Sequence, residues 1–401
     1  MRIVGLDFTR SLAIFLAMAS HAFNEAGLYT YLPAELSFYL KICMQLAPPV
    51  FIVLFGVMLE LVYLPRMESG RAAAVSARLW TRALQCWLLY AISIFVLFLV
   101  RDDYSLMFSL SCIFFMGNSP YTEILKLYTV LLFLSPLLIL IRIRFGLGLC
   151  ILFAIAYQIA WPIGNGLAHA MADENAPIQF VRFVKFITGF GDTRVAGPSV
   201  LHGVSLMVAG WALTALLRKA ILAQSPRAST LKTFEFDRQK LKLFFGLSFA
   251  FTVLTFFALP SSYISGIPNM ELRMMSHPVY FICGTSVAYA TAIFLVMVFD
   301  SWKFGSRELL NKLSFFGRTS LFTFAWGNIL LYLINLTPDG PAETKIYALS
   351  LTLSIVLMSY GFDVLNKKSS WLADAISWFL RPFEVRVKTY FEKNQSEFQS
   401  N

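Results

Sequence analysis

Residues 6–25 read LDFTRSLAIFLAMASHAFNE, an apolar stretch long enough to enter a membrane that nevertheless carries Asp7, Arg10, His21 and Glu25. Arg10 and His21 are eleven positions apart. That is about three helical turns, so a helix places both on one face, about 16 Å apart along its axis. An ionisable group at mid-membrane costs about 2.5–3.5 kcal/mol, so such groups normally face protein or water. The stretch predicts a spanning helix that lines a polar passage.

Each feature of this stretch also has a simpler interpretation. In that interpretation Arg10 extends to the cytosolic headgroups, and His21 is a hydrogen-bonded packing residue. Residues 17–19, AMA, also imitate the cleavage site of a signal peptide. The apolar region before that site is short and contains Asp7 and Arg10, so we expect no cleavage.

The composition of the whole chain excludes an ordinary soluble domain. Of 401 residues, 58% are hydrophobic and only 14% are charged. Repeated apolar runs predict an all-α fold, a polytopic integral membrane protein with about ten transmembrane helices. The net charge of +10 lies in short loops between apolar runs, so it fits membrane topology and we expect no nucleic-acid partner. The five cysteines lack the spacing of metal ligands, and we interpret them as packing residues.

The distribution of Lys and Arg predicts the orientation of the chain. With the N-terminus in the cytosol, 25 of the 33 Lys and Arg residues fall in cytosolic segments, so both termini are predicted to be cytosolic. We expect residues 1–366 to form the membrane domain and residues 367–401 a cytosolic amphipathic tail. The predicted spans are 8–27, 43–64, 82–100, 123–141, 147–165, 199–217, 243–261, 277–299, 319–337 and 345–365.

Two outer segments fall outside the spans. Residues 104–117 are apolar but short, which predicts an interfacial or re-entrant piece. Residues 177–190, PIQFVRFVKFITGF, predict an amphipathic basic helix on the outer surface. Whether this helix, with Arg182 and Lys185, anchors the membrane surface or covers a substrate is left open by the sequence.

The four histidines all fall toward the predicted outer side: His21, His169, His202 and His277. No pair has the helical spacing of zinc ligands and no cysteines accompany them, so we expect no metal. Acid–base chemistry by His21 is the stronger hypothesis, since histidine titrates near neutral pH. Glu25, one turn on, is the candidate carboxylate to orient it, and a simple helix-end carboxylate is the alternative.

The predicted inner side carries arginines instead. Arg78 and Arg82 are one turn apart in RLWTRAL, and with Arg10 they are of the type that holds phosphates by forked hydrogen bonds. Ordinary positive-inside anchoring is the competing interpretation. Glu60, inside an apolar run, needs a partner and is expected to pair with one of these arginines.

Several segments together resemble the membrane acyltransferase type 3 family. Arg10, ten intervening residues and His21 match its R-x10-H pattern, and residues 6–21 look like its opening helix. Residues 49–63 followed by 78–84 are similar to its second and third spans. Residues 124–141 resemble the fourth span of the periplasmic-glucan succinyltransferase branch, and residues 317–334 look like a late span. The resemblance extends over nearly the whole chain in span order.

Two positions depart from that family's pattern. Asn328 stands where many relatives carry a histidine, and Ser11 stands where the glucan-succinylating branch has a glycine. The departures put the role of the late histidine and the branch assignment in question.

The resemblance implies an O-acyltransferase of the bacterial inner membrane. It implies a cytosolic acyl-CoA donor (acetyl-CoA or succinyl-CoA), an extracytoplasmic polysaccharide or glucan acceptor, surrounding membrane lipids and no tightly bound cofactor. His21, Arg10 and Glu25 become the catalytic candidates, and Arg10, Arg78 and Arg82 the donor-binding candidates. Direct attack by the acceptor and passage through an acyl-His21 intermediate both remain open. A transporter or flippase and a non-catalytic scaffold are the competing classes, and the oligomeric state is not indicated.

Overall fold

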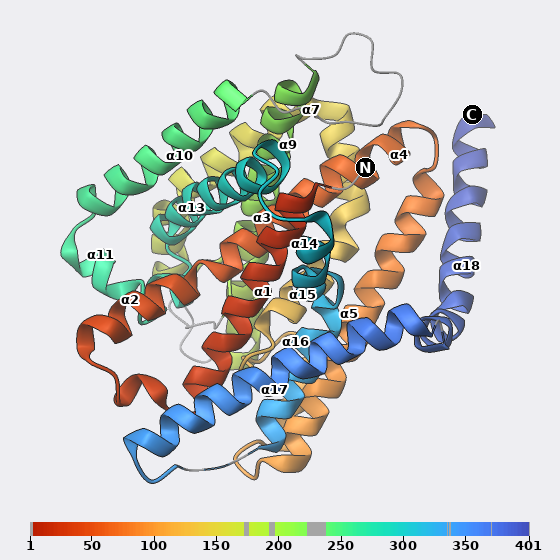
Figure 1. Ribbon diagram of the computed structural model, residues 1–401. Helices are drawn as coiled ribbons and strands as arrows, with labels where there is room; N and C mark the ends of the chain where they lie inside the picture. Colours follow the sequence, from red (N-terminus) through yellow and green to blue (C-terminus); the bar gives the residue numbers. More distant parts are fainter. Residues whose placement is uncertain are drawn as a thin grey trace. The chain divides into compact units, whose positions relative to one another are not determined.

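The computed structural model describes residues 3–171, 176–191, 197–222, 238–334, 336, 338–369 and 371–400. All regular secondary structure in these ranges is helical, which confirms the all-α prediction (Figure 1). The elements in chain order are α1 (Val4–Glu25), η1 (Leu28–Thr30), α2 (Ala34–Gln45), α3 (Ala47–Met58), η2 (Leu59–Tyr63), α4 (Leu64–Glu68), α5 (Ala72–Val100), α6 (Leu106–Ile113), α7 (Glu123–Ala170), α8 (Ile178–Thr188), α9 (Val200–Leu222), α10 (Arg238–Ala258), α11 (Ser261–Gly266), α12 (Glu271–Met274), α13 (Pro278–Val296), η3 (Met297–Ser301), α14 (Arg307–Leu313), α15 (Phe315–Arg318), α16 (Ser320–Leu333), α17 (Pro341–Lys368) and α18 (Trp371–Ser400).

Seven helical stretches in the described ranges are long and apolar enough to cross a membrane. The difference from the predicted ten has three sources. The polar residues of α1 lower its hydropathy, α16 has only 14 residues, and α7 is counted once although it covers two predicted spans. The membrane character is therefore supported, while the number ten stays a prediction. Residues 223–237 of the expected basic cytosolic loop, and the side chains of Trp371 and Ile376 in the expected tail, lie outside the described part.

The long helix α7 changes direction at Gly146. This residue has φ 78° and ψ 169°, in the region that favours glycine because a Cβ would be strained there. The break lies between the predicted spans 123–141 and 147–165. Glycine at this point lets two spans join with almost no connecting loop.

Apolar side chains cover the outside of several long helices. On α10 the large exposed side chains include Leu247, Phe249, Leu254 and Phe257. A soluble protein keeps such residues inside, whereas a lipid-facing helix exposes them. The surface of α10 therefore suits a hydrocarbon environment.

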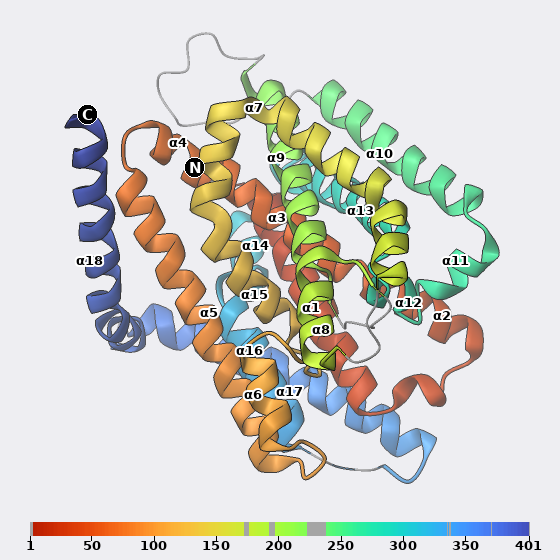
Figure 2. The same cartoon turned by 180° about the vertical axis from the view of Figure 1, so that it is seen from behind.

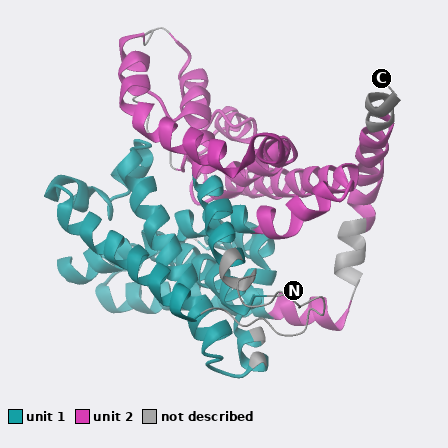
Figure 3. Ribbon diagram, turned by 90° about the horizontal axis from the view of Figure 1, so that it is seen from above, with its two compact units in different colours: residues 1–57, 206–360 teal, residues 58–205, 361–401 magenta. Residues whose placement is uncertain are grey.

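The helices form two compact units (Figure 3). Unit 1 contains residues 1–57 and 206–360, and unit 2 contains residues 58–205 and 361–401. In unit 1, α1 packs against α13, α15 and α16 (Figure 1). In unit 2, α5 packs against α6, α7 and α18, as Figure 2 shows for α5 and α6.

The N-terminal end of α1 is fixed by η3 and α13. The carboxylate of Asp300 accepts hydrogen bonds from the amides of Val4, at 3.0 Å, and Gly5, at 2.7 Å. A carboxylate there satisfies amides that lack a helical partner and complements the helix dipole. A Cβ on Gly5 would lie 2.5 Å from the Cα of Val296, so only glycine permits this close packing.

The middle of α1 is held by α15 and α16. The Ser11 hydroxyl accepts a hydrogen bond of 2.8 Å from the Gly317 amide. Met18 lies against Gly327, where a Cβ would be 2.5 Å from its Cε. These contacts fix the position of the helix that carries Arg10 and His21.

Candidate functional site

His21 is oriented by a residue far away in the sequence. Its Nδ1 lies 3.0 Å from Oδ1 of Asn328, on α16, whose side chain is fully buried. An amide oxygen only accepts, so Nδ1 must carry the hydrogen in this pair. In that tautomer Nε2 carries no hydrogen, which is the form of imidazole that can remove a proton.

A cation lies within electrostatic reach of His21. Arg273, on the short helix α12, lies close enough to His21 and to the Tyr280 hydroxyl for its charge to interact with both. One of its terminal nitrogens lies 2.7 Å from Sδ of Met270. The Nε of Arg273 is buried and donates no hydrogen bond to the residues that the structure describes. The arrangement can stabilise negative charge that develops beside His21.

Arg10 and Glu25 lie on α1 on either side of His21 along the helix. Both are half-buried, and Glu25 is the last residue of the helix. The three side chains therefore share one rigid element of unit 1. Glu25 is the residue predicted to orient the ring of His21. Asn328 is a second candidate for this role, because it is hydrogen-bonded to Nδ1, and the role of Glu25 stays a prediction.

The predicted arginine pair lies in unit 2. Arg78 and Arg82 are both exposed on α5, and Arg82 donates a hydrogen bond of 2.8 Å to Oε1 of Gln85. Two exposed guanidinium groups one turn apart can meet an anionic group from outside the protein. Their combination with Arg10 into one cluster stays a prediction.

Glu60 pairs with an arginine other than those expected. Its Oε1 lies 2.8 Å from Arg142 of α7, and the Glu60 side chain is only 5% exposed. A charge in an apolar run requires such a partner. The contact joins η2 to α7 and leaves Arg78 and Arg82 exposed.

The other histidines have structural environments. His202 is fully buried, with Nδ1 at 2.8 Å from the Ser199 hydroxyl and 3.0 Å from the Tyr157 hydroxyl. His277 caps the start of α13 by accepting from the Val279 amide, and His169 is exposed near the end of α7. In the part of the chain that the structure describes, no group of three His, Cys, Asp or Glu residues is placed to hold a metal ion.

The basic helix that the sequence predicts for the outer surface differs from its predicted character. Residues 178–188 do form α8, but the side chain of Lys185 is completely buried and donates to the carbonyl of Gly191. Lys185 therefore fixes the turn after the helix and does not face a glycan or a headgroup. Phe186 is likewise buried, and the centre of its ring lies 4.5 Å from the ammonium nitrogen of Lys126 on α7.

Two residues of this site were not among those predicted. Asn328 is noted in the sequence only as a departure from relatives, and Arg273, in the segment ELRMM, has no local pattern that marks it. His21 and Asn328 are 307 positions apart. Only the packing of α1 on α16 brings them together.

The first quarter of the chain is similar to a known family. Residues 2–109 match the family model described as OpgC protein, a family of periplasmic glucan succinylation. The matched range contains His21, Arg10, Glu25, Arg78 and Arg82, whereas Asn328 and Arg273 lie outside it. A comparison with curated proteins finds no match. Together with the apolar helices, the match supports a membrane transferase that modifies glucans with acyl groups.

Proposed function

We propose that this protein is a membrane-embedded O-acyltransferase of the bacterial inner membrane. It transfers an acetyl or succinyl group from cytosolic acyl-CoA to a hydroxyl of an extracytoplasmic glycan. The observation that carries the proposal is the hydrogen bond of 3.0 Å that Asn328 of α16 makes with His21, whose helix α1 lies in the range that matches a glucan-modifying family. It gives a histidine in the tautomer that base catalysis needs.

In the proposed reaction, Nε2 of His21 removes the proton of the acceptor hydroxyl. The acceptor oxygen attacks the thioester carbonyl carbon, and the tetrahedral intermediate then expels the thiolate of coenzyme A. The imidazolium returns its proton to that sulfur, so the histidine ends the cycle neutral. Asn328 keeps the ring in one orientation, and Arg273 faces the oxyanion of the intermediate. The route through an acyl-His21 intermediate uses the same residues.

The donor is assigned to the arginines. Arg10, Arg78 and Arg82 would hold its phosphates, because guanidinium groups form forked hydrogen bonds with phosphate oxygens. Arg10 and His21 are about 16 Å apart along α1, a distance suited to an extended pantetheine arm. Arg10 forms no hydrogen bond or ion pair with the residues that the structure describes, so its guanidinium is available to a ligand.

The proposal is tested by following free thiol release from acetyl-CoA and succinyl-CoA. Wild type and His21→Ala are purified in nanodiscs and assayed with and without crude periplasmic glycans. We expect glycan-dependent release by wild type, and a loss of about 10²–10⁴-fold in His21→Ala, the usual contribution of a general base.

Two results would count against the proposal. Equal release by wild type and His21→Ala would remove the catalytic role of His21. If neither donor is consumed although glycan and donor both bind, the class is wrong, and movement of a labelled glycan across the membrane is the next assay.

A further inference from the structure

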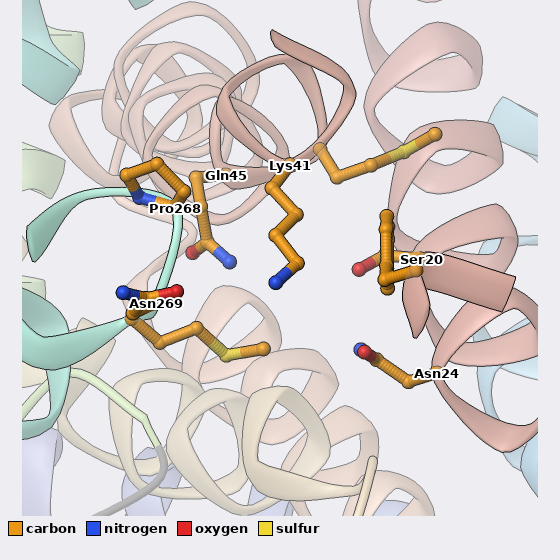
Figure 4. Close-up of a pocket in the computed structure, with 9 residues that line it drawn as sticks. Ser20, Asn24, Lys41, Gln45, Pro268 and Asn269 are labelled. Carbon is orange, nitrogen blue, oxygen red and sulfur yellow. The ribbon is translucent and has the colours of Figure 1, made fainter. Parts of the chain in front are cut away.

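A cavity of about 180 Å³ in unit 1 is lined by Ser20 and Asn24, which precede and follow His21 along α1 (Figure 4). Ser20 and Asn24 of α1 form one side, and Lys41 and Gln45 of α2 form another. The turn of residues 268–270 forms a third side. In Figure 4 the polar ends of the four side chains from α1 and α2 point toward the centre of the cavity.

Gln45 contributes a buried amide oxygen that no described residue satisfies. The residue is only 5% exposed, and its Oε1 is buried without a hydrogen-bond donor among the described residues. Its backbone carbonyl is already used, as the acceptor for the Tyr280 hydroxyl. An unsatisfied buried amide oxygen costs about 1–3 kcal/mol, so such an atom normally has a partner. Gln45 lines the cavity, so a hydrogen-bond donor bound there would satisfy this oxygen.

Lys41 provides a hydrogen-bond donor to the cavity, whereas Gln45 provides an acceptor. Its ammonium group lies 5.0 Å from the centre of the Tyr29 ring and forms no ion pair with the described residues. Tyr29 in turn shares a hydrogen bond with Ser20. An ammonium group donates only, so one wall of the cavity donates while Gln45 accepts.

This combination selects one ligand chemistry. A purely anionic group can only accept, and it would leave Oε1 of Gln45 unsatisfied. An apolar group would satisfy neither residue. Neighbouring hydroxyls both donate and accept, and Met44 and Met270 supply apolar surface for the C–H groups between them. The volume is below the roughly 300–1,000 Å³ of pockets for drug-sized ligands, so it admits a single sugar ring.

We propose that this cavity is a subsite for one neutral sugar unit, held by Lys41 and Gln45. This inference rests on the proposed function, because the sugar that the cavity binds is taken to be a unit of the acceptor glycan. The cavity also shares a residue contact with the site, since Met270 of the cavity contacts Arg273.

The test is binding of methyl β-glucoside to the full-length protein in nanodiscs, measured by saturation-transfer NMR. Wild type is compared with Gln45→Leu and Lys41→Met, and with Lys345→Met, which removes an exposed lysine of α17 as the matched control. We expect each cavity variant to weaken binding about tenfold or more, as loss of a hydrogen bond to a buried or charged group predicts. Lys345→Met binds as wild type does.

Gln45→Glu keeps the side-chain volume and the hydrogen-bond acceptor. If this variant still binds the glucoside, the loss of binding in Gln45→Leu comes from the missing acceptor and not from misfolding. Equal binding by wild type, Gln45→Leu and Lys41→Met overturns the inference, as does binding of succinate in place of the glucoside. The proposed function fails separately. Sugar binding with no acyl transfer by wild type contradicts only the proposed reaction, whereas transfer that needs His21 but not Gln45 or Lys41 contradicts only the subsite.

Discussion

At the residue scale, the proposed reaction depends on which nitrogen of His21 carries the hydrogen. Asn328 sets this through one hydrogen bond from α16. The sequence identifies His21, because a histidine inside an apolar helix is unusual and the residues around it are enough to reveal it. It does not identify Asn328 or Arg273 as partners, because such partners depend on tertiary packing across hundreds of positions.

Asn328→Leu removes the acceptor while keeping similar volume. We expect kcat to fall about tenfold or more, which is about 1.4 kcal/mol of transition-state stabilisation, with KM for donor and acceptor little changed. Steady-state kinetics on both substrates measures this. Asn328→His, whose unprotonated ring nitrogen can also accept a hydrogen bond, should keep most of the rate.

Thr323→Val is the control on the same helix. Thr323 is buried and donates to the Ser359 hydroxyl at 2.9 Å, so its loss should lower stability by about 1 kcal/mol and leave kcat unchanged. An equal fall of kcat in both variants would mean that Asn328 acts only through the packing of α16.

At the element scale, α1 is held by close backbone packing. Apolar runs and a few polar residues are enough to predict that residues 6–25 form a helix, because that pattern is local. The contacts that fix this helix come from distant segments. Asp300 accepts a hydrogen bond from its backbone, and the Gly317 amide donates one to the Ser11 hydroxyl. The break at Gly146 has a local signal, since Arg142 and Arg144 separate the two predicted spans there.

Gly5→Ala tests the packing of α1 on α13. The added Cβ would meet backbone atoms of Val296 at 2.5 Å, and backbone cannot move aside cheaply. We expect a loss of about 1–3 kcal/mol, measured as a lower unfolding midpoint in nanodiscs. Gly246→Ala on α10 is the control: nothing lies within 4 Å of its Cβ, so stability should hold or rise. A stable Gly5→Ala would refute the close approach.

The pair of Glu60 and Arg142 joins two elements of unit 2. Arg142→Met leaves a buried carboxylate without this partner, and we expect a loss of about 3–5 kcal/mol. Combining it with Glu60→Leu should recover much of the stability, since two apolar side chains replace the pair. Chemical denaturation of the three variants gives the coupling. Additive losses would contradict a direct pairing.

At the scale of the whole molecule, the orientation in the membrane rests on charge alone. The prediction of cytosolic termini follows from 25 of 33 Lys and Arg residues lying on one side, a statistical property of the entire chain. The number of spans is harder to predict because a kinked helix and a short helix escape simple length criteria.

Cysteine labelling tests the orientation. In a Cys43→Ser background, which removes an exposed native thiol, His169→Cys should react with an impermeant maleimide added to intact spheroplasts. Lys388→Cys on α18 should react only after permeabilisation. The reverse pattern would invert the topology and place His21 on the cytosolic side.

The proposed reaction requires His21 to remove the proton of a glycan hydroxyl during acyl transfer. The most direct measurement is the amount of labelled acyl group, from labelled acetyl- or succinyl-CoA, that becomes attached to purified glucan. Wild type is compared with His21→Gln, with donor binding measured in parallel. We expect labelled ester on the glucan with wild type and a loss of at least about 10²-fold with His21→Gln, at unchanged donor affinity. Undiminished labelling by His21→Gln would contradict it.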